Sequence, residues 1–392
     1  MTAPTRERSD EHDALRHLVR DFARAEVEPH VAEWDRTHTF PADIVPKLGE
    51  LGLFGLTAPE RYGGAEADFT SLCIAVEELG YVDQSIGITL SAGVGLGISP
   101  ILKFGTDAQR DRWLPDLVAG RALASFGLTE PDAGSDAGAT RTRAELTNGE
   151  WVINGSKAFI TNSGTPITTC ITITARTGTR DDGRPEISTI IVPTGTPGFT
   201  VEPAYDKLGW HASDTHGLTF DDCRVPEDSL LGPRGDGLRQ MLGILDDGRI
   251  AIAALAVGLI RRCLDECTTQ ATNRVTFGEP IGSRQGVAFA ISDLAVDLEA
   301  SRLLTYHAAS LKDAGRGREE VSMAAAAAKL FATEAAVRAT RTATQVFGGY
   351  GFMEESPVAR LYRDAKILEI GEGTSEVQRM VIARSLGLPA AS

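Results

Sequence analysis

One carboxylate near the C-terminus stands out because of its neighbours. Glu372 lies between two glycines in the segment GEGTSEVQR, residues 371–379. Flanking glycines let the backbone approach a ligand without a Cβ in the way. The following Ser375 and Gln378 fit a capping box that begins the last helix. A carboxylate in a loop just before a helix start can act as a general base, although most such glutamates are simply solvated.

Two segments in the middle of the chain are suited to a polar ligand. LTEPDAGSD, residues 128–136, follows a strand-like run, and its composition exposes backbone N–H groups and short hydroxyls to an anionic or flavin-like group. In NGSKAFITNSG, residues 154–164, Phe159 and Thr161 share one parity on a strand, so an aromatic ring and a hydroxyl face the same way. The plain alternatives are a surface turn and a core Phe beside a solvated Thr.

A glycine-rich segment, QVFGGYGF at residues 345–352, follows a long helical pattern. Its paired glycines supply a helix C-cap and a tight turn. The segment is not a G-x-G-x-x-G fingerprint and no βαβ unit surrounds it, so a Rossmann nucleotide site is rejected.

Three regions of different composition must position these segments. Residues 11–120 show helical periodicity, with apolar residues at i, i+3, i+4 and i+7. Residues 123–231 are dense in β-branched residues, and Asn148-Gly149 between two strand-like runs is a hairpin signal. Because no helical pattern interrupts these runs, antiparallel pairing is expected rather than a parallel βαβ sheet. Residues 237–388 are helical again.

The last region predicts a bundle of long helices. We expect helices over residues 237–274, 284–313 and 320–347, the third with an Ala-rich face at 324–328 that packs closely against neighbours at a subunit interface. The predicted fold class is α+β, mainly α: an N-terminal helical domain (1–121), a middle antiparallel β domain (122–232) and a C-terminal four-helix bundle (233–392).

Composition excludes several classes of protein. With 39 basic and 54 acidic residues the net charge is −15, which disfavours nucleic acid as a partner. Five scattered cysteines indicate reduced thiols in a cytoplasmic protein, and the i, i+4 pair Cys263 and Cys267 is not a usual zinc spacing, so no metal is expected. The first residues lack an apolar leader and include acids untypical of a transit peptide. The best apolar run, residues 250–260, is about half of what a membrane span needs.

Taken together, these motifs resemble those of the acyl-CoA dehydrogenases, flavoenzymes built as helical domain, β domain and four-helix bundle. The resemblance extends from about Asp10 to Leu388 and also rests on RVTFGEPI at 274–281 and RLYRDAKILEI at 360–370. Each motif alone is weak, but all of them in order are specific. The resemblance implies FAD as cofactor, an acyl-CoA substrate, an electron-transfer flavoprotein as acceptor and a homo-oligomer, most often a tetramer.

The resemblance also implies roles for individual residues. Glu372 matches the catalytic base. Residues expected to contact FAD are Phe126, Leu128, Thr129, Gly134, Ser135, Phe159, Ile160, Thr161, Arg274, Phe277, Gln285, Gln345, Val346, Gly348, Gly349, Thr374, Ser375 and Glu376. Among them, Arg274, Gln285 and residues 345–349 resemble positions that hold the FAD of a neighbouring subunit. Residues expected near the acyl-CoA are Ser135, Asp246, Asp247, Gly248, Arg249, Gly371 and Gly373.

The implied chemistry removes an α-proton while flavin N5 accepts the β-hydride. The enolate that develops needs a donor at the thioester oxygen, here the backbone N–H of Glu372 and a ribityl hydroxyl. A bound acyl chain is expected to desolvate Glu372 and raise its pKa towards neutrality. Some relatives place the base on the first bundle helix. The matching residue here is Gly248, which has no carboxylate, and Asp247 is expected to face another way.

Two departures from the family pattern bear on the substrate. Phe159 stands where many members have Trp, which keeps an aromatic ring, and Gly371 stands where short- and medium-chain members often have Tyr. Since branched-chain members have a small residue there, a short or short branched acyl thioester is expected. Four hypotheses of function stay open. The first is the dehydrogenase, and the second is an enzyme of the same fold that acts as an oxidase or on carrier-protein-bound acyl groups. The third is a hydroxylase-like relative, although those generally lack this Glu, and the fourth is a non-enzymatic helical scaffold.

Overall fold

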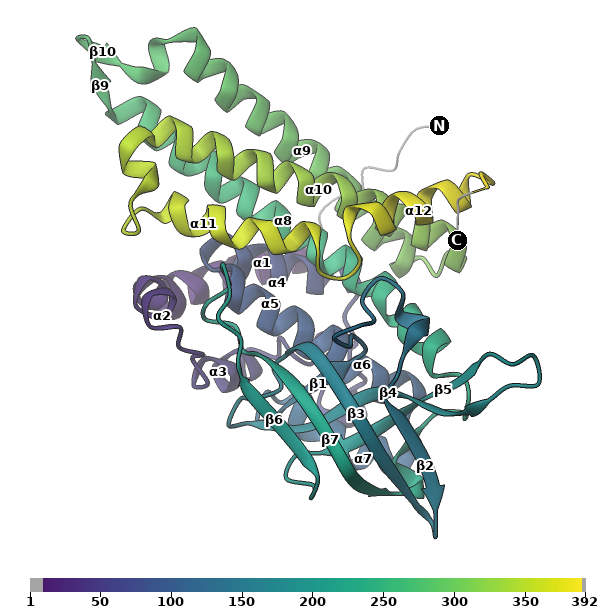
Figure 1. Cartoon of the computed structure of the whole chain (residues 1–392). Helices are drawn as coiled ribbons and strands as arrows, with labels where there is room; N and C mark the ends of the chain where they lie inside the picture. Colours follow the sequence, from purple (N-terminus) through teal and green to yellow (C-terminus); the bar gives the residue numbers. More distant parts are fainter. Residues whose placement is uncertain (1–9, 390–392) are drawn as a thin grey trace.

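The computed structural model describes residues 10–389 and places helical, β and helical regions in chain order (Figure 1). Residues 1–9, on which part of the prediction about a leader depends, lie outside the described range. The N-terminal region is helical as predicted, with Asp68, Asp83 and Thr106 as N-caps. Its helices are α1 (Asp10–Phe22), α2 (Val31–Thr37), α3 (Ile44–Glu50), α4 (Phe69–Val82), α5 (Gln84–Ala92), α6 (Ser99–Phe104) and α7 (Asp107–Val118).

The helix over α5 and α6 contains a π-helical segment, Gly93–Ile98, where glycines allow close packing. A Cβ at Gly93 would lie 2.5 Å from the Phe54 ring, and one at Gly97 would lie 2.6 Å from the Ala124 carbonyl oxygen. The stretch Gln84–Phe104 is also long and apolar enough to cross a membrane by length and composition, contrary to the prediction that no such stretch exists. Most of that window (78%) is buried inside the protein, as in the core helix of a globular domain.

The middle region forms one sheet in the strand order β6-β7-β3-β2-β4-β5-β8, with β1 paired to β4. Asn148 (φ 53°) and Gly149 (φ 81°) form the predicted hairpin turn between β2 and β3. Most pairs are antiparallel, but β1 pairs with β4 in parallel, as does one residue of β2. The strands are β1 (Leu123–Gly127), β2 (Arg143–Thr147), β3 (Glu150–Thr161), β4 (Thr168–Thr179), β5 (Pro185–Pro193), β6 (Phe199–Ala204), β7 (Thr215–Pro226) and β8 (Leu230–Leu231).

The C-terminal region is the predicted bundle of long helices. They are α8 (Gly237–Asn273), α9 (Gln285–Asp313), α10 (Arg318–Phe347), α11 (Pro357–Ala365) and α12 (Ser375–Ser385), and a small hairpin of β9 (Val275–Thr276) and β10 (Glu279–Pro280) joins α8 to α9. Ala325, Ala326 and Ala328 of α10 are buried within this chain, where α10 packs on α8, so the predicted close packing is confirmed, whereas the place of this helix at a subunit interface stays a prediction.

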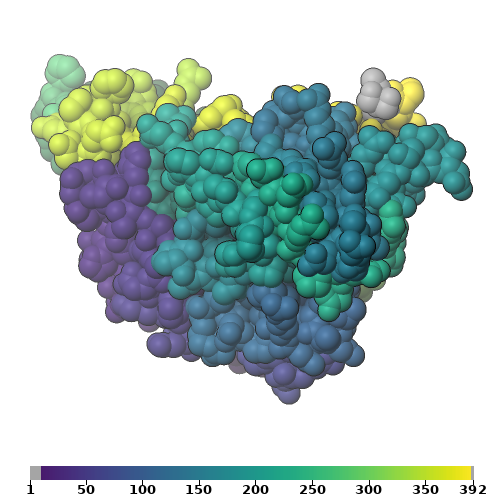
Figure 2. Space-filling model, turned by 60° about the horizontal axis from the view of Figure 1, so that its bottom comes forward, coloured from purple at the N-terminus to yellow at the C-terminus, as the bar shows by residue number. Residues whose placement is uncertain are grey.

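Two cores hold these regions together. The larger one joins the N-terminal helices to the bundle, because α4 packs along α8, and it includes Cys263 and Cys267. The smaller one lies within the sheet around Trp151 and Ile171. Figure 2 shows the N-terminal helices (purple and blue) and the sheet (teal) on one face, with the end of the bundle (yellow-green) along its upper edge. Within residues 10–389 no group of three or more His, Cys, Asp or Glu side chains could hold a metal ion.

Candidate active site

Glu372 occupies a left-handed turn immediately before α12. Its φ is +57° and that of Gly373 is +92°, so glycine is required only at the second position. Thr374, not Ser375, is the N-cap of α12, since its hydroxyl accepts from the Val377 N–H at 3.3 Å. The predicted capping box is therefore wrong by one residue, because Gln378 bonds to the Gly373 carbonyl oxygen (2.8 Å) and not to the N-cap N–H.

The carboxylate of Glu372 faces α8 at Gly248. A Cβ at position 248 would lie 2.5 Å from Glu372 Oε2 and 2.9 Å from Oε1, so the absence of a side chain there makes room for the carboxylate. Asp247 is engaged elsewhere, as expected: its two carboxylate oxygens accept from Lys103 (2.6 Å) and Lys312 (2.7 Å). Gly248 thus gives Glu372 its place, whereas Asp247 faces another way.

The environment of Glu372 keeps its carboxylate poorly hydrated. Oε2 is enclosed and accepts no hydrogen bond from residues 10–389, although the residue as a whole is half-buried and keeps part of its surface open. Burial raises the pKa of the Glu372 carboxyl to about 7. The cations of Arg249 and Lys329 oppose this rise, and the charge of Asp247 adds to it. A carboxylate with this pKa is suited to proton abstraction near neutral pH.

The loop after β1 is fixed beside β3. Thr129 accepts at its carbonyl oxygen from the Ala158 N–H (2.9 Å). Glu130 forms a buried ion pair with Lys157 (2.7 Å) and also accepts from the backbone N–H groups of Arg141 (2.7 Å) and Thr142 (3.1 Å). Its carboxylate therefore closes the loop that contains the four candidate residues Leu128, Thr129, Gly134 and Ser135. The sequence does not reveal this ion pair, because its two members are 27 residues apart.

Phe126 and Leu128 join this loop to α8. Both are buried in a small apolar cluster with Met241 and Ile244 of α8, the helix that also holds Gly248. Phe126 and Leu128 therefore pack against the first part of the helix that carries the candidate residues Asp246, Asp247 and Arg249.

Phe159 presents an exposed ring at a bulge in β3. It has φ +60°, is 65% exposed and packs against Tyr205 with ring centroids 5.1 Å apart. Ala158 and Ile160 are buried, whereas Phe159 is exposed and Thr161 is half-buried. The alternative prediction that Phe159 is a core residue is therefore wrong. That Phe159 and Thr161 face the same way stays a prediction, because β3 is irregular at this place.

Several features fit a flavin-sized heterocycle. The Phe159 ring is large, apolar and uncovered within the described chain. Added atoms at Gly134 would meet nothing within 4 Å, so the loop leaves open space. Ser375 Oγ at the N-terminal end of α12 is buried and has no partner among residues 10–389, and such a helix end favours an anionic group. FAD would therefore find an aromatic cover, room and a polar anchor.

A second set of candidate residues lies at the other end of the bundle. Between Gly248 and Asn273, α8 spans about 38 Å at about 1.5 Å per residue. Beyond that end lie the small hairpin and the adjoining helix ends, remote from α12 in Figure 1. The residues there are Arg274, Phe277, Gln285, Gln345, Val346, Gly348 and Gly349. They do not meet the Glu372 turn within one chain, as expected if they serve a second copy.

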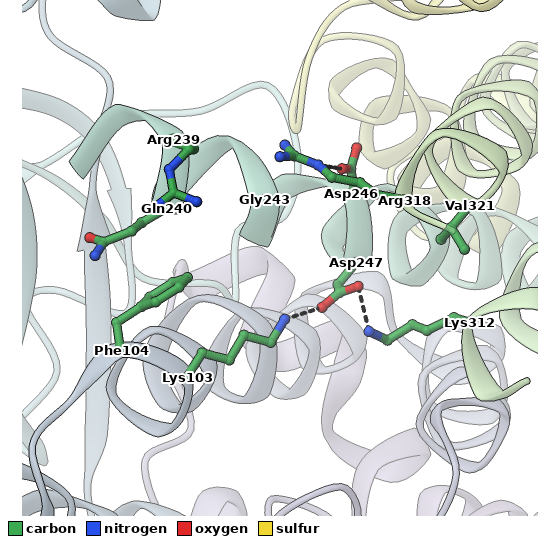
Figure 3. A pocket seen from close by; sticks show the side chains of 10 residues that line it. All are labelled: Lys103, Phe104, Arg239, Gln240, Gly243, Asp246, Asp247, Lys312, Arg318 and Val321. Atoms are coloured by element: carbon green, nitrogen blue, oxygen red, sulfur yellow. Dashed lines mark hydrogen bonds and ion pairs between the residues drawn. The ribbon is translucent and has the colours of Figure 1, made fainter. Parts of the chain in front are cut away.

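A cavity of about 310 Å³ lies beside Asp246 and Asp247 (Figure 3). Its walls come from α6, α8, α9 and α10, and four cations face it: Lys103, Arg239, Lys312 and Arg318. With only two carboxylates among its lining residues, the cavity is locally basic on a chain of net charge −15. The sequence did not reveal this cavity, because the cations come from four separate helices. An anionic group of a ligand would be stabilised here.

Comparisons with known proteins agree with the geometry of this site. Three family models match: the acyl-CoA dehydrogenase N-terminal domain over residues 9–121, the middle domain over 125–223 and the C-terminal domain over 235–387. The chain is 47% identical to the probable acyl-CoA dehydrogenase YngJ of Bacillus subtilis, covering 97% of this chain and 99% of the relative. It is 43% identical to the mitochondrial short-chain specific acyl-CoA dehydrogenase of Bos taurus, covering 96% and 90%.

Solved structures are similar over nearly the whole chain. Butyryl-CoA dehydrogenase from Megasphaera elsdenii superposes with a TM-score of 0.93 at 39% identity, covering 98% of this chain and all of the other. A chain in the structure of the electron transferring flavoprotein of Acidaminococcus fermentans gives 0.92 at 40% identity (96% and 98% covered). The prolyl acyl carrier protein oxidase AnaB gives 0.91 at 30% identity (97% and 99% covered).

Proposed function

The chain belongs to the acyl-CoA dehydrogenase family, and we propose that it oxidises a short or short branched-chain acyl-CoA to the trans-2-enoyl-CoA with Glu372 as base. Members of this family are FAD-dependent oxidoreductases, and the three matched domains together cover nearly all of the described chain. The observation that supports the assignment of the base is the enclosed carboxylate oxygen of Glu372, which has no hydrogen-bond partner in the described part of the chain and faces the backbone of Gly248.

The residues of this chain divide the chemistry between them. Glu372 takes the α-proton at Oε2, and the electron pair of that C–H bond forms the new double bond as the β-hydrogen leaves with its own pair. Phe159, Thr161 and the start of α12 would hold FAD, which when bound would provide the acceptor for that hydrogen. The backbone N–H of Glu372 donates to the thioester oxygen and stabilises the enolate that develops. Enclosure of the carboxylate excludes water that would otherwise compete for the proton.

The activity should depend on pH through one carboxyl group. We expect kcat/KM for butyryl-CoA to rise with pH along a single titration with its midpoint near 7. Because the carboxylate is the active form and its pKa is about 7, about half of the free enzyme is active at pH 7 and about a tenth at pH 6. Initial rates between pH 5.5 and 9 measure this, and a midpoint below 5.5 would contradict an enclosed base.

Gly248→Ala separates activity from stability. Its Cβ would overlap Glu372 Oε2, but the carboxylate is the end of a flexible side chain and can move away. We expect turnover to fall about 100-fold, since a displacement of about 1 Å of a catalytic group has this order of effect. The melting temperature should stay the same or rise, because Ala favours a helix interior over Gly by about 1 kcal/mol. Unchanged turnover in a folded variant would show that the carboxylate does not work from this position.

The proposed substrate class rests on Gly371 and on the relatives. A Cβ at position 371 would meet only the Ile367 carbonyl oxygen, at 3.5 Å, so the glycine leaves room beside the base. Similar proteins are described as short-chain specific and as butyryl-CoA dehydrogenase, which supports short acyl groups. Competition among butyryl-, isobutyryl- and isovaleryl-CoA will rank them, and a strong preference for chains of eight or more carbons would reject the class.

A homo-oligomer, most simply a tetramer, is part of the proposal. On α9, Phe289, Val296 and Leu303 recur every seven residues and are 62%, 68% and 66% exposed. Such an apolar stripe on one helix face is typical of a surface that another subunit covers. The distant candidate residues from Arg274 to Gly349 would then complete the FAD site of a second copy. We also propose a cytoplasmic protein that passes electrons to an electron-transfer flavoprotein.

One experiment tests the proposed reaction directly. The purified protein is expected to be yellow with an oxidised flavin spectrum, and anaerobic butyryl-CoA should bleach it with formation of crotonyl-CoA. A colourless protein that binds no added FAD, or a flavin that no acyl-CoA bleaches, would reject the function and leave the scaffold alternative.

An acyl group on a carrier protein is the second candidate, since the AnaB oxidase has the same fold and acts on a carrier-protein substrate by its name. The basic cavity suits a phosphate of either carrier. Butyryl-CoA and butyryl-phosphopantetheinyl carrier protein are therefore compared as reductants of the bound flavin. Reoxidation in air against reoxidation by an electron-transfer flavoprotein distinguishes an oxidase from a dehydrogenase.

A further inference from the structure

Two buried side chains converge on the turn that presents Glu372. Lys329 of α10 is fully buried, and its Nζ donates to the Gly373 carbonyl oxygen at 2.8 Å. Gln378 of α12, also fully buried, donates from Nε2 to the same oxygen at 2.8 Å and weakly to the Glu372 carbonyl oxygen at 3.4 Å. A carbonyl oxygen has two lone pairs, so these two donors saturate it.

The turn needs such support because of its backbone. Glu372 is one of the few non-glycine residues with positive φ, a conformation that an L-residue adopts only when the surroundings hold it. The Gly373 carbonyl belongs to the Gly373–Thr374 peptide, so its two donors fix the end of the turn, and the weaker bond from Gln378 reaches the Glu372 carbonyl of the peptide directly after the base. Without the two donors the turn could relax, and the carboxylate would leave its place beside Gly248.

Lys329 adds a charge to its hydrogen bond. Within residues 10–389 no carboxylate lies within 4.0 Å of its Nζ, and the charge acts on Glu372 through space. The other charged groups around the pair are engaged: Arg249 with Asp246 (2.6 Å), Asp247 with Lys103 and Lys312, Glu334 with Arg379 (2.7 Å) and Glu369 with Lys366. Burial lowers the pKa of the Lys329 ammonium to about 8, so it is mostly charged at pH 7.

We infer that Lys329 and Gln378 are positioning residues for the base: together they hold the left-handed turn, and Lys329 in addition favours the carboxylate form of Glu372. This inference depends on the proposed function, since it concerns the same carboxylate. The inference gives a role to Lys329, which follows the Ala-rich segment of α10 and takes no direct part in the proposed reaction.

Three variants of the holoenzyme test the inference. Lys329→Met removes donor and charge at similar length, and Gln378→Met removes the other donor without a change of charge. Thr333→Val is the matched control: Thr333 is fully buried one turn farther along α10, and its hydroxyl bonds only to the Lys329 carbonyl oxygen (2.8 Å). For each protein we would measure FAD content, kcat and the midpoint of the pH profile of kcat/KM with butyryl-CoA.

The two variants are expected to differ in a way that a merely structural role would not produce. Lys329→Met should lower kcat at least tenfold at pH 7 and move the midpoint upward by about one pH unit, since the carboxylate loses a cation. Gln378→Met should lower kcat about tenfold with the midpoint unchanged. Thr333→Val should match the wild type in both, and all three should retain FAD.

Each outcome bears on the inference. A Lys329→Met enzyme with wild-type midpoint and kcat overturns the role of the lysine. If that variant fails to fold, Gln378→Met with wild-type kcat still overturns the shared hold on the turn. Failure of the proposed function is recognised separately, because the wild-type flavin would then not be reduced by butyryl-CoA at any pH.

Discussion

Glu372→Gln is expected to lower the rate of flavin reduction by butyryl-CoA by about three orders of magnitude or more. An amide of the same shape keeps the turn and its contacts but does not accept a proton at neutral pH, and a general base contributes up to about 10⁴-fold. No neighbouring carboxylate can substitute. Asp247 is held by Lys103 and Lys312, and Asp246 accepts from Arg249 (2.6 Å) and Ser322 (2.9 Å).

Rapid-mixing measurements of flavin bleaching give this rate without interference from the electron acceptor. FAD content should equal that of the wild type, and the melting temperature should be the same or higher, because Glu372 makes no ion pair within 4.0 Å in the described chain and burial disfavours its charged form. Glu355→Gln, an exposed residue in the loop before α11, provides the control and should react at the wild-type rate. A Glu372→Gln rate within tenfold of wild type would remove the carboxylate from the mechanism.

The sequence predicted the parts of this protein that depend on local signals. The three long bundle helices follow from their apolar periodicity and length, and Asn148-Gly149 marked its hairpin because both residues tolerate positive φ. The parallel pairing of β1 with β4 was missed, since the two strands are joined by a long connection that contains β2 and β3, and no local turn signals such a pairing. The Ala-rich segment of α10 indicates close packing, but composition alone does not identify α8 as the helix on which it packs.

In the candidate site too, the features with a local sequence signal were predicted and those that depend on tertiary contacts were not. Glu372 was found from its glycine neighbours, but the left-handed conformation belongs to Glu372 itself and to Gly373, and a positive φ at glutamate has no sequence signal. Lys329 and the Glu130–Lys157 ion pair were missed because each acts across elements that only the tertiary fold brings together. The sequence held one hint of the role of Lys329: an Ala-rich helix is expected to be buried, and a lysine inside it is therefore unusual.

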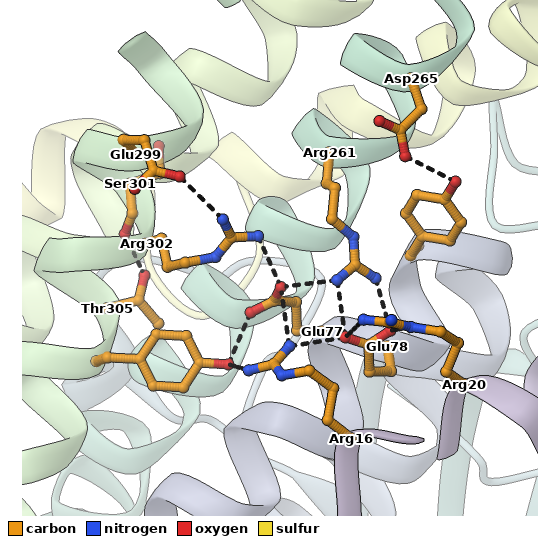
Figure 4. Close-up of polar contacts among 12 residues, drawn as sticks. Arg16, Arg20, Glu77, Glu78, Arg261, Asp265, Glu299, Ser301, Arg302 and Thr305 are labelled. Carbon is orange, nitrogen blue, oxygen red and sulfur yellow. Dashed lines mark hydrogen bonds and ion pairs between the residues drawn. The ribbon is translucent and has the colours of Figure 1, made fainter. Parts of the chain in front are cut away.

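A buried ion network between the N-terminal helices and the bundle leads to the largest expected effect on stability (Figure 4). Glu78 of α4 has no exposed side-chain surface and accepts from Arg16 (2.7 Å) and Arg20 (3.1 Å) of α1 and from Arg261 (2.7 Å) of α8. Its neighbour Glu77 accepts from Arg16, Arg261, Arg302 and the Tyr306 hydroxyl. Two buried carboxylates thus accept hydrogen bonds from four guanidinium groups.

We expect Glu78→Ala to destabilise the protein by about 3–5 kcal/mol, because it leaves buried guanidinium groups without a partner rather than removing a whole ion pair. The shift of the urea midpoint measures this. Glu33→Ala is the matched control: Glu33 pairs with Arg36 at the same 2.7 Å, but both side chains are more than 60% exposed. Its loss should cost less than about 1 kcal/mol. Equal shifts in the two variants would contradict the difference that burial makes.

The same network predicts how stability responds to acid. The arginines lower the pKa of Glu78 to about 2, from an ordinary value of 4.5, despite its burial. A lowered carboxyl pKa contributes stability that is complete above pH 4.5 and is lost as the pH falls towards 2. Glu78→Ala should therefore flatten the decline of the urea midpoint between pH 5 and 3, whereas Glu33→Ala should leave its slope unchanged. Since α1 and α4 meet α8 through these groups, the acid-labile step is expected to separate the N-terminal helices from the bundle that holds Gly248.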